Sequence, residues 1–272
     1  MFTIKTYNAI SEKGLVRFPA SEYVIDPTAS APDAVMLRSF KMHAEPVADS
    51  VKAIGRAGAG VNNIPVDVMS QRGIVVFNAP GANANAVKEL VIAGMLMACR
   101  NLHKAWQYTT TLSGNDAEMS KAVEEGKKKY VGFELPGRTL GVIGLGAIGV
   151  QVANAASTLG MRVIGFDPTI TVQSAWKLSS HVEEMESADE LFKQSDFVTF
   201  HVPLVESTKN LLNAKRLATM PNGAVILNFA RDGIVDDAAV LAAIESGKVH
   251  AYVTDFPSNL LQIGRASCRE RV

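Results

Sequence analysis

Residues 139–149 read Thr139-Leu-Gly-Val-Ile-Gly144-Leu-Gly146-Ala-Ile-Gly149. The apolar start of this stretch predicts a buried strand, and the residues from Gly149 onward predict a helix with an apolar stripe. Between them lies a Gly-x-Gly-x-x-Gly pattern. Its glycines permit a tight turn, close approach of the backbone to a pyrophosphate, and close packing of the helix on the strand. The helix start also offers free N–H groups to phosphates. The sequence therefore predicts a dinucleotide-binding loop made by Gly144, Gly146, Ala147, Ile148 and Gly149.

The next expected strand ends in Gly165-Phe-Asp167-Pro168. Asp167 follows the glycines by about 20 residues, the spacing at which an acidic side chain binds the adenine ribose of a dinucleotide. A carboxylate in this place accepts hydrogen bonds from the ribose hydroxyls and repels a 2′-phosphate, which favours NAD over NADP. The alternative is that Asp167 only forms a turn before Pro168. The complete strand–glycine–helix–strand context favours the cofactor interpretation.

Strand-like and helix-like runs alternate along the chain, which predicts an α/β fold with parallel sheets. Short apolar runs predict strands at residues 2–7, 34–37, 51–54, 74–77, 140–143, 162–165, 197–201, 224–228 and 250–253. Helices are expected at residues 44–49 and 65–71, and a long helix is expected to begin near Asn85. The polar, lysine-rich stretch 113–137 is interpreted as a connector into a second domain.

The composition excludes several classes of protein. With 47% hydrophobic and 20% charged residues, the 272-residue chain can bury sizeable cores, which excludes intrinsic disorder and collagen-like repeats. The 27 basic and 27 acidic residues cancel, so no net charge favours binding to nucleic acid or a membrane surface. Cys99 and Cys268 lack metal-ligand spacing, so no metal site is expected. Without a secretion signal in residues 1–14 or an apolar run long enough for a bilayer, a cytoplasmic location is expected.

The last residues change character abruptly. Residues 262–272 read Gln262-Ile-Gly-Arg-Ala-Ser-Cys-Arg-Glu-Arg-Val272 and show neither a helical nor a strand period. The string resembles one reading frame of a sequencing-library adapter, so we interpret it as a non-native tail and exclude it from fold reasoning. A short basic tail is the alternative.

Several further motifs, in a fixed order, extend over nearly the whole chain up to Phe256. They are Leu37-Arg38-Ser-Phe-Lys41-Met42, the stretch 55–64, Asn78-Ala-Pro-Gly-Ala-Asn83, the stretch 141–149, His201-Val-Pro-Leu204 and Asn228-Phe-Ala-Arg231-Asp-Gly-Ile-Val235. With these motifs the chain resembles the D-isomer specific 2-hydroxyacid dehydrogenase family, and within it the 3-phosphoglycerate dehydrogenases.

The resemblance implies two Rossmann-like, doubly wound parallel-sheet domains with the active site in the cleft between them. Residues 1–84 would form an incomplete, flavodoxin-like substrate-binding domain. Residues 85–261 would form an NAD-binding Rossmann domain that lacks its last strand. Such proteins commonly dimerise through the NAD domain, so a homodimer or tetramer is expected for the full-length protein. The implied activity is the NAD-dependent oxidation of 3-phospho-D-glycerate to 3-phosphohydroxypyruvate, the first step of serine biosynthesis.

By the same resemblance, Arg231 is the catalytic arginine that grips the substrate carboxylate and carbonyl with its planar fork of donors. The loop at Ala59 and Gly60 would offer backbone N–H groups to the carboxylate. Arg38 and Lys41 are candidates to bind a distal phosphate, although Arg38 could also be an ordinary surface residue. The other implied cofactor neighbours are His201, Val202, Pro203, Thr208, Phe229, Ala230 and Asp255.

Members of this family use a histidine in a Pro-His-Leu-Gly-like turn as the general acid/base, supported by an upstream glutamate. The 272 residues contain no such turn, and the glutamate position falls near Asn259. Because a positioned acid/base contributes roughly 10²–10⁴-fold in rate, we expect this chain to turn over poorly. The alternatives are another D-2-hydroxyacid dehydrogenase, such as a glyoxylate or hydroxypyruvate reductase, and a non-catalytic protein that senses NAD.

Overall fold

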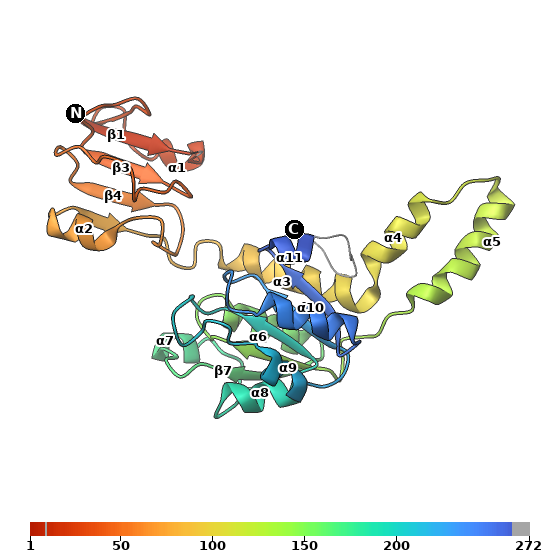
Figure 1. Ribbon diagram of the computed structural model, residues 1–272. Coiled ribbons are helices and arrows are strands. Elements are labelled where there is room, and N and C mark those ends of the chain that lie inside the picture. The colour runs from red at the N-terminus through yellow and green to blue at the C-terminus, as the bar shows by residue number, and fades with distance from the viewer. Residues whose placement is uncertain (9, 263–272) are drawn as a thin grey trace. The chain divides into compact units, whose positions relative to one another are not determined.

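The computed structural model describes residues 1–8 and 10–262. Residues 263–272 of the proposed tail therefore lie outside the described residues, and so does Cys268. The chain forms two compact units, the first spanning Met1–Asn83 and the second beginning at Ala84 (Figure 1). Each unit contains its own parallel sheet, which confirms the predicted α/β fold class.

Unit 1 is built on a five-stranded parallel sheet. In order across the sheet, its strands are β2 (Tyr23–Ile25), β1 (Phe2–Tyr7), β3 (Ala34–Leu37), β4 (Ala53–Arg56) and β5 (Val75–Phe77). This is the 2-1-3-4-5 order of flavodoxin-like folds. The edge strand β2 is not among the expected strands, because its three residues are too few to show a hydrophobic period.

Two short helices accompany this sheet, α1 (Glu12–Leu15) and α2 (Val66–Gln71). The core of unit 1 lies on one face of the sheet, where buried strand residues such as Val35 and Ile54 pack against Met69 of α2. The chain leaves α2 through Gly73, whose φ of 71° lies in the left-handed region that glycine adopts most readily.

The prediction of a helix at residues 44–49 is wrong, and β4 begins at Ala53 rather than at residue 51. Residues 44–49 form a turn, a bend and irregular backbone instead, and the Glu45 N–H donates to the carbonyl of Met42 at 3.2 Å. The physical reason is Pro46, which has no backbone N–H and disfavours a helical conformation in the residue before it. Val47 and Ala48 still pack against the core, which accounts for the apolar pattern that suggested a helix.

Unit 2 is built on a six-stranded parallel sheet. In order across the sheet, its strands are β11 (Val249–Thr254), β10 (Ala224–Asn228), β9 (Phe197–Phe200), β6 (Thr139–Ile143), β7 (Arg162–Phe166) and β8 (Val182–Glu184). If β6 is counted as the first strand of the unit and β11 as the sixth, the order across the sheet, starting from β8, is 3-2-1-4-5-6. This is the strand order of dinucleotide-binding Rossmann folds. The short edge strand β8 is not among the expected strands.

Helices cover both faces of this sheet. On one face lie α3 (Ala84–Arg100) and α6 (Gly149–Thr158), and on the other lie α8 (Ala188–Gln194), α9 (Ala214–Thr219) and α10 (Asp237–Glu245). Two further short helices are α7 (Val172–Ala175) and α11 (Asn259–Gln262). Every residue of β6, β9 and β10 is buried, as expected for parallel strands that are covered on both faces.

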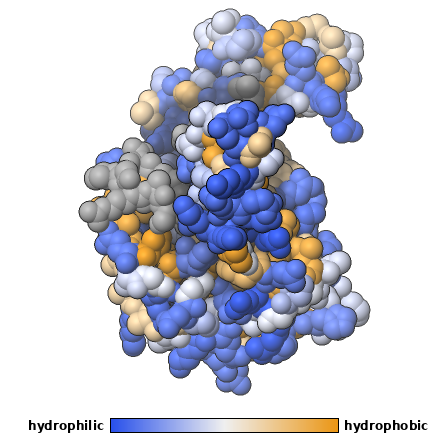
Figure 2. Space-filling model, turned by 90° about the vertical axis from the view of Figure 1, so that its right-hand side faces the viewer, coloured by the Kyte–Doolittle hydropathy of each residue, from blue (hydrophilic) through white to orange (hydrophobic). Residues whose placement is uncertain are grey.

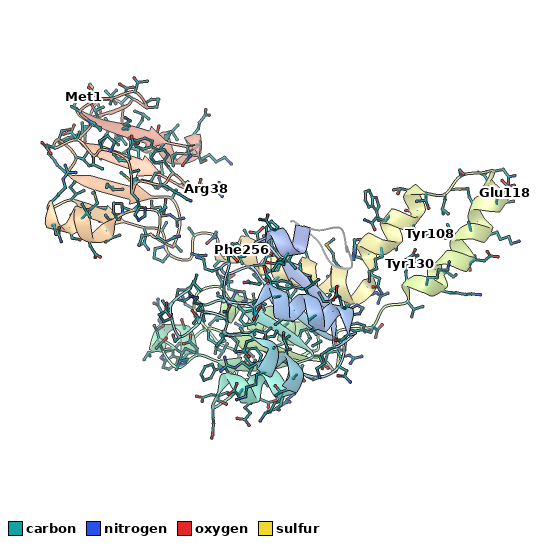
Figure 3. All side chains as sticks on the ribbon, in the orientation of Figure 1. Met1, Arg38, Tyr108, Glu118, Tyr130 and Phe256 are labelled. Atoms are coloured by element: carbon teal, nitrogen blue, oxygen red, sulfur yellow. The ribbon has the colours of Figure 1, made fainter. Side chains whose placement is uncertain are left out.

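A helical hairpin projects from unit 2 and consists of α4 (Leu102–Thr110), α5 (Asp116–Gly126) and the 3-10 helix η1 (Lys127–Tyr130) (Figure 1). The Tyr108 hydroxyl donates to the carbonyl of Ala122 at 2.7 Å, and the Tyr108 and Tyr130 rings lie 5.5 Å apart (Figure 3). The interpretation of residues 113–137 as a connector between domains is therefore wrong. The overlooked signal is a capping box, in which the Glu118 N–H donates to Asn115 and the Asn115 N–H donates to Glu118.

Within the described ranges, no helix is long and apolar enough to cross a membrane. The longest helix, α3, has 17 residues, whereas a span needs about 20 apolar ones. The face seen in Figure 2 is largely hydrophilic, with apolar residues in smaller groups between the polar ones.

Phe200 should contribute strongly to the stability of unit 2, because its side chain is fully buried and its ring lies 6.2 Å from that of Phe192. We expect Phe200→Ala to lower the free energy of unfolding by about 3–5 kcal/mol, since it leaves a cavity in a close-packed core. Urea unfolding followed by circular dichroism measures this loss. Leu159→Ala is the control, because Leu159 is 38% exposed. An equal loss in both variants would contradict the packing.

Candidate functional site

The glycine loop lies at the carboxyl end of β6. Gly144 adopts a φ of 91°, in the left-handed region. A Cβ on Gly149 would lie 1.9 Å from the carbonyl oxygen of Gly144, so α6 can start this close to β6 only without a side chain. A Cβ on Gly146 would meet nothing within 4 Å. The turn and the close packing are both present, and open space lies where a pyrophosphate would approach.

The start of α6 presents backbone donors to this open space. Among the residues that the structure describes, no acceptor meets the N–H groups of Gly146, Ala147 and Ile148. These groups precede or begin the ten-residue helix α6, whose dipole adds positive potential at this end. An anion such as a pyrophosphate would satisfy the free donors.

Asp167 follows β7 and fixes the glycine loop. Its Oδ2 accepts a hydrogen bond from the Leu145 N–H at 2.8 Å. Its Oδ1 accepts from the N–H and the hydroxyl of Thr169 at 2.9 and 3.1 Å. Asp167 therefore does form a turn, and it also joins the glycine loop to the segment after β7. A dinucleotide would contact both of these segments. A carboxylate oxygen has a second lone pair, so these bonds leave acceptor capacity for a ribose hydroxyl.

The segment after β9 lies against the glycine loop. A Cβ on Gly144 would lie 2.7 Å from the His201 carbonyl oxygen and 2.7 Å from Cγ1 of Val202. Beyond it, the Thr208 hydroxyl donates to the carbonyl of Pro203 at 2.6 Å, which closes the loop. His201 and Val202 thus line the glycine loop, whereas Pro203 and Thr208 are joined to each other by a hydrogen bond within the segment after β9.

The imidazole of His201 is buried. Its Nε2 lies 3.1 Å from the Thr199 hydroxyl, and its Nδ1 finds no hydrogen-bond partner within residues 1–8 and 10–262. Burial lowers the pKa of His201 to about 3. The ring is therefore neutral at physiological pH, which does not suit it to donate a proton there.

β10 ends in a turn that presents Arg231. Phe229 and Ala230 are buried, whereas the Arg231 side chain is exposed and its Nη1 donates to the Ala230 carbonyl at 2.6 Å. Arg231 forms no ion pair with any described residue. The exposed Asp255 follows β11, and its N–H donates to the Asn228 carbonyl at 3.2 Å. Arg231 and Asp255 thus follow the ends of the adjacent strands β10 and β11.

Arg38 and Lys41 lie in unit 1, in the turn after β3 (Figure 3 labels Arg38). The Arg38 carbonyl accepts from Arg56 Nε and from Asn63 Nδ2, each at 3.2 Å. Asn63 also donates to the Phe40 carbonyl at 2.7 Å, so this amide fixes the turn. Both cationic side chains are exposed and form no ion pair in the described part of the chain.

Ala59 and Gly60 lie in the loop after β4. The Ala59 carbonyl accepts from Asn78 Nδ2 at 2.7 Å, and the Gly58 carbonyl accepts from the Ala79 N–H at 3.0 Å. These bonds hold the loop by its carbonyls. The N–H groups of Ala59 and Gly60 make no hydrogen bond to any residue that the structure describes.

Each unit gathers its own candidates at the carboxyl edge of its parallel sheet. In unit 2 they follow β6, β7, β9, β10 and β11, and in unit 1 they follow β3 and β4. The sequence reasoning missed the asparagines that hold these loops, namely Asn63, Asn78 and Asn228. For Asn78 and Asn228 the available signal was an asparagine at or directly after a strand end, where its amide can replace missing backbone partners. Asn63 lies between β4 and α2 and carries no such signal.

The residues of unit 2 fit an NAD molecule. The open space at Gly146, the free N–H groups at the start of α6 and the Asp167 carboxylate match a pyrophosphate and a ribose. Within the described residues, no group of three His, Cys, Asp or Glu side chains could hold a metal ion.

Known proteins share this sequence and fold. The chain is 41% identical over 208 residues to the D-3-phosphoglycerate dehydrogenase of Methanocaldococcus jannaschii, covering 76% of this chain and 37% of that protein. It is 40% identical over 202 residues to the hydroxypyruvate reductase of Thermotoga maritima, covering 74% and 60%. The NAD⁺-bound 3-phosphoglycerate dehydrogenase of Entamoeba histolytica superposes with a TM-score of 0.71 at 26% identity, covering 95% of this chain and 81% of that one. The chain thus spans less than two thirds of the length of these two curated relatives.

Residues 92–260 match the NAD binding domain of the D-isomer specific 2-hydroxyacid dehydrogenases. The match begins within α3 and ends within α11, so it includes the glycine loop, Asp167 and the Arg231 turn. NAD is the cofactor of this domain, in agreement with the geometry of the loop. The chain belongs to the D-isomer specific 2-hydroxyacid dehydrogenase family.

Proposed function

We propose that the chain is part of an NAD-dependent dehydrogenase that oxidises 3-phospho-D-glycerate to 3-phosphohydroxypyruvate, the first step of serine biosynthesis. The observation that carries this proposal is a set of cations without ion-pair partners among the described residues: Arg231 in unit 2, and Arg38 with Lys41 in unit 1. A phosphorylated 2-hydroxy acid needs one such group for its carboxylate and another for its phosphate. The similarity to the Methanocaldococcus jannaschii protein supports this substrate.

The strand order of unit 2 supports a position of the nicotinamide end of the cofactor over β9 and β10. The pyrophosphate loop follows the central strand β6, and Asp167 follows its neighbour β7. The adenosine half therefore extends over β7, and the nicotinamide half extends in the opposite direction, over β9 and β10. The Arg231 turn after β10 would then face the nicotinamide.

Bound NAD would accept a hydride from the hydroxyl-bearing carbon of the substrate. The Arg231 guanidinium would hold the substrate carboxylate and its reacting oxygen in two-point fashion. The proton of the hydroxyl needs a separate base, for which the buried His201 is unsuited because of its lowered pKa. The 272 residues contain no Pro-His-Leu-Gly-like turn, so we expect poor turnover from these residues alone.

A second candidate is the reduction of hydroxypyruvate or glyoxylate. The similarity to the Thermotoga maritima protein favours it at almost the same level of identity. The two candidates differ in the phosphate, so the cations of unit 1 decide between them.

We further propose that residues 1–84 belong to the substrate-binding domain, that the full-length protein is a cytoplasmic homodimer or tetramer, and that α3 and the hairpin α4–α5 form its interface. Trp106 on α4 is 67% exposed, and Val131 after η1 is 75% exposed. Exposed apolar side chains of this size favour contact with a second copy.

Gly146→Val should weaken NADH binding about tenfold or more, because a side chain would occupy the open space over the loop. Titration of NADH fluorescence with the chain measures the change. Gly14→Val is the matched control, since a Cβ on Gly14 also meets nothing within 4 Å but lies in α1 of unit 1. Equal affinities of the Gly146 variant and the unmodified chain would contradict the cofactor site.

Arg38→Ala in the full-length protein should raise the KM for 3-phosphohydroxypyruvate by roughly 10- to 100-fold, because a charge-assisted hydrogen bond is lost. The KM for hydroxypyruvate, which lacks the phosphate, should change little. Steady-state assays of NADH oxidation with both substrates measure the difference. Arg17→Ala, another exposed arginine of unit 1, is the control. Equal effects on both substrates would reject the phosphate assignment and favour the second candidate.

The buried His201 should make unit 2 less stable in mild acid. Its pKa of about 3 in the folded state lies below that of an unfolded histidine, near 6.5, so only the unfolded state takes up the proton between these values. The free energy of unfolding is unaffected by protonation of this residue well above pH 6.5, and it falls by ~2 kcal/mol when the pH is lowered to 5. Urea unfolding at several pH values should show that His201→Gln removes this part of the pH dependence. The same pH dependence in both proteins would contradict the burial of a neutral ring.

A further inference from the structure

Asn228 holds the turn that follows β10 from inside the protein. Its side chain is almost fully buried, with 1% exposure. The Ala230 N–H donates to its Oδ1 at 3.2 Å, and its Nδ2 donates to the Arg231 carbonyl at 2.9 Å. One amide therefore satisfies a donor and an acceptor of the same turn, and it fixes the direction in which the turn leaves the strand.

The neighbouring residues restrict this turn on both sides of the sheet. Phe229 belongs to the core under α3, where a Cβ on Gly94 would lie 3.3 Å from its Cζ. Ala230 belongs to the core on the opposite face. The core thus fixes the side chains of Phe229 and Ala230, while the amide of Asn228 binds the peptide groups of the turn.

Tyr252 supports Asn228 from the adjacent strand β11. Its ring is buried in the core with Ala230, and its hydroxyl faces the side chains of Asn228 and Thr254. The hydroxyl also donates a long hydrogen bond of 3.5 Å to Oδ1 of Asp237. Burial raises the pKa of Tyr252 to about 12, so the hydroxyl keeps its proton at physiological pH. The hydroxyl is therefore neutral and buried, on a strand residue that pairs with Ile226, two residues before Asn228.

We propose that Asn228 is a positioning residue that sets the turn Phe229–Arg231 against the nicotinamide end of the bound cofactor, and that Tyr252 holds Asn228 in this role. The proposal rests on the proposed function, because it takes the nicotinamide to lie over β10. It assigns a role to two residues that touch neither the cofactor nor the substrate. They act on the cofactor only through the turn.

The test compares NADH with ADP-ribose, which lacks the nicotinamide. Isothermal titration of the chain gives the dissociation constant of each ligand. Asn228→Ala should weaken NADH binding about tenfold while ADP-ribose binding stays within about twofold. Tyr252→Phe removes only the hydroxyl and should weaken NADH binding by a smaller factor. Since Tyr252 acts through Asn228, the double variant should bind NADH no more weakly than Asn228→Ala.

Asn154→Ala is the matched control. Asn154 lies in α6 of the same unit, donates to the Lys177 carbonyl at 2.8 Å and accepts from the Ser179 N–H at 2.8 Å. It therefore ties a loop with the same chemistry but away from β10. Its substitution should leave the ratio of the NADH and ADP-ribose dissociation constants unchanged.

The outcomes separate the two proposals. An equal loss of NADH and ADP-ribose binding in Asn228→Ala would show a structural role only and would overturn the inference, as would unchanged binding of both ligands. Additive losses in the double variant would overturn the part assigned to Tyr252. If the unmodified chain bound neither ligand, the cofactor site of the proposed function would itself be wrong. Retained ADP-ribose binding in the variants also shows that they fold.

Discussion

The contact between Gly149 and the carbonyl of Gly144 is the constraint on which the cofactor edge of unit 2 depends. With no Cβ at residue 149, α6 starts directly above the end of β6, and its first N–H groups face the space over Gly146. The Leu145 N–H is held by Asp167 of the next strand, so the loop is fixed from β7 as well. Any side chain at residue 149 would move the helix away from the strand and draw these donors away from a pyrophosphate.

Some arginines of the described chain form ion pairs, and others stand at the carboxyl edges of the sheets without one. Arg72, Arg138, Arg162 and Arg216 pair with carboxylates on the surfaces of their own units. Arg38 and Arg231, by contrast, stand at the carboxyl edges of the sheets without an ion pair to the described residues. Exposed ion pairs contribute little to stability. The cations at the sheet edges that lack such a pair are therefore the better candidates for binding an anionic ligand. They are suited to a dianionic or trianionic substrate, which would supply the missing partners.

The sequence was sufficient for the features that depend on local spacing. The glycine loop, Asp167 and the first strand Phe2–Tyr7 follow from patterns within a few residues, and the structure has them where the patterns indicate. The edge strands β2 and β8 were missed because three residues show no period and are recruited by pairing with β1 and β7. The role of Asn228 was missed for a different reason. Its partners Ala230 and Arg231 are close in the sequence, but only the turn after β10 brings them within reach of its amide, and Tyr252 belongs to the neighbouring strand β11.

The acidic residues near the turn after β10 bear on which anionic group of the proposed substrate, the carboxylate or the phosphate, would bind Arg231. Burial raises the pKa of Asp237, and the charges of Asp232 and Asp236 raise it further. A phosphate at this turn, with its larger negative charge, would be repelled by these acidic side chains more strongly than a carboxylate. Under the proposed function the phosphate would instead bind Arg38 and Lys41, in whose turn, residues 38–42, the sequence has no acidic residue. The amide of Asn228 that holds this turn through the Arg231 carbonyl is neutral and adds no further charge to it.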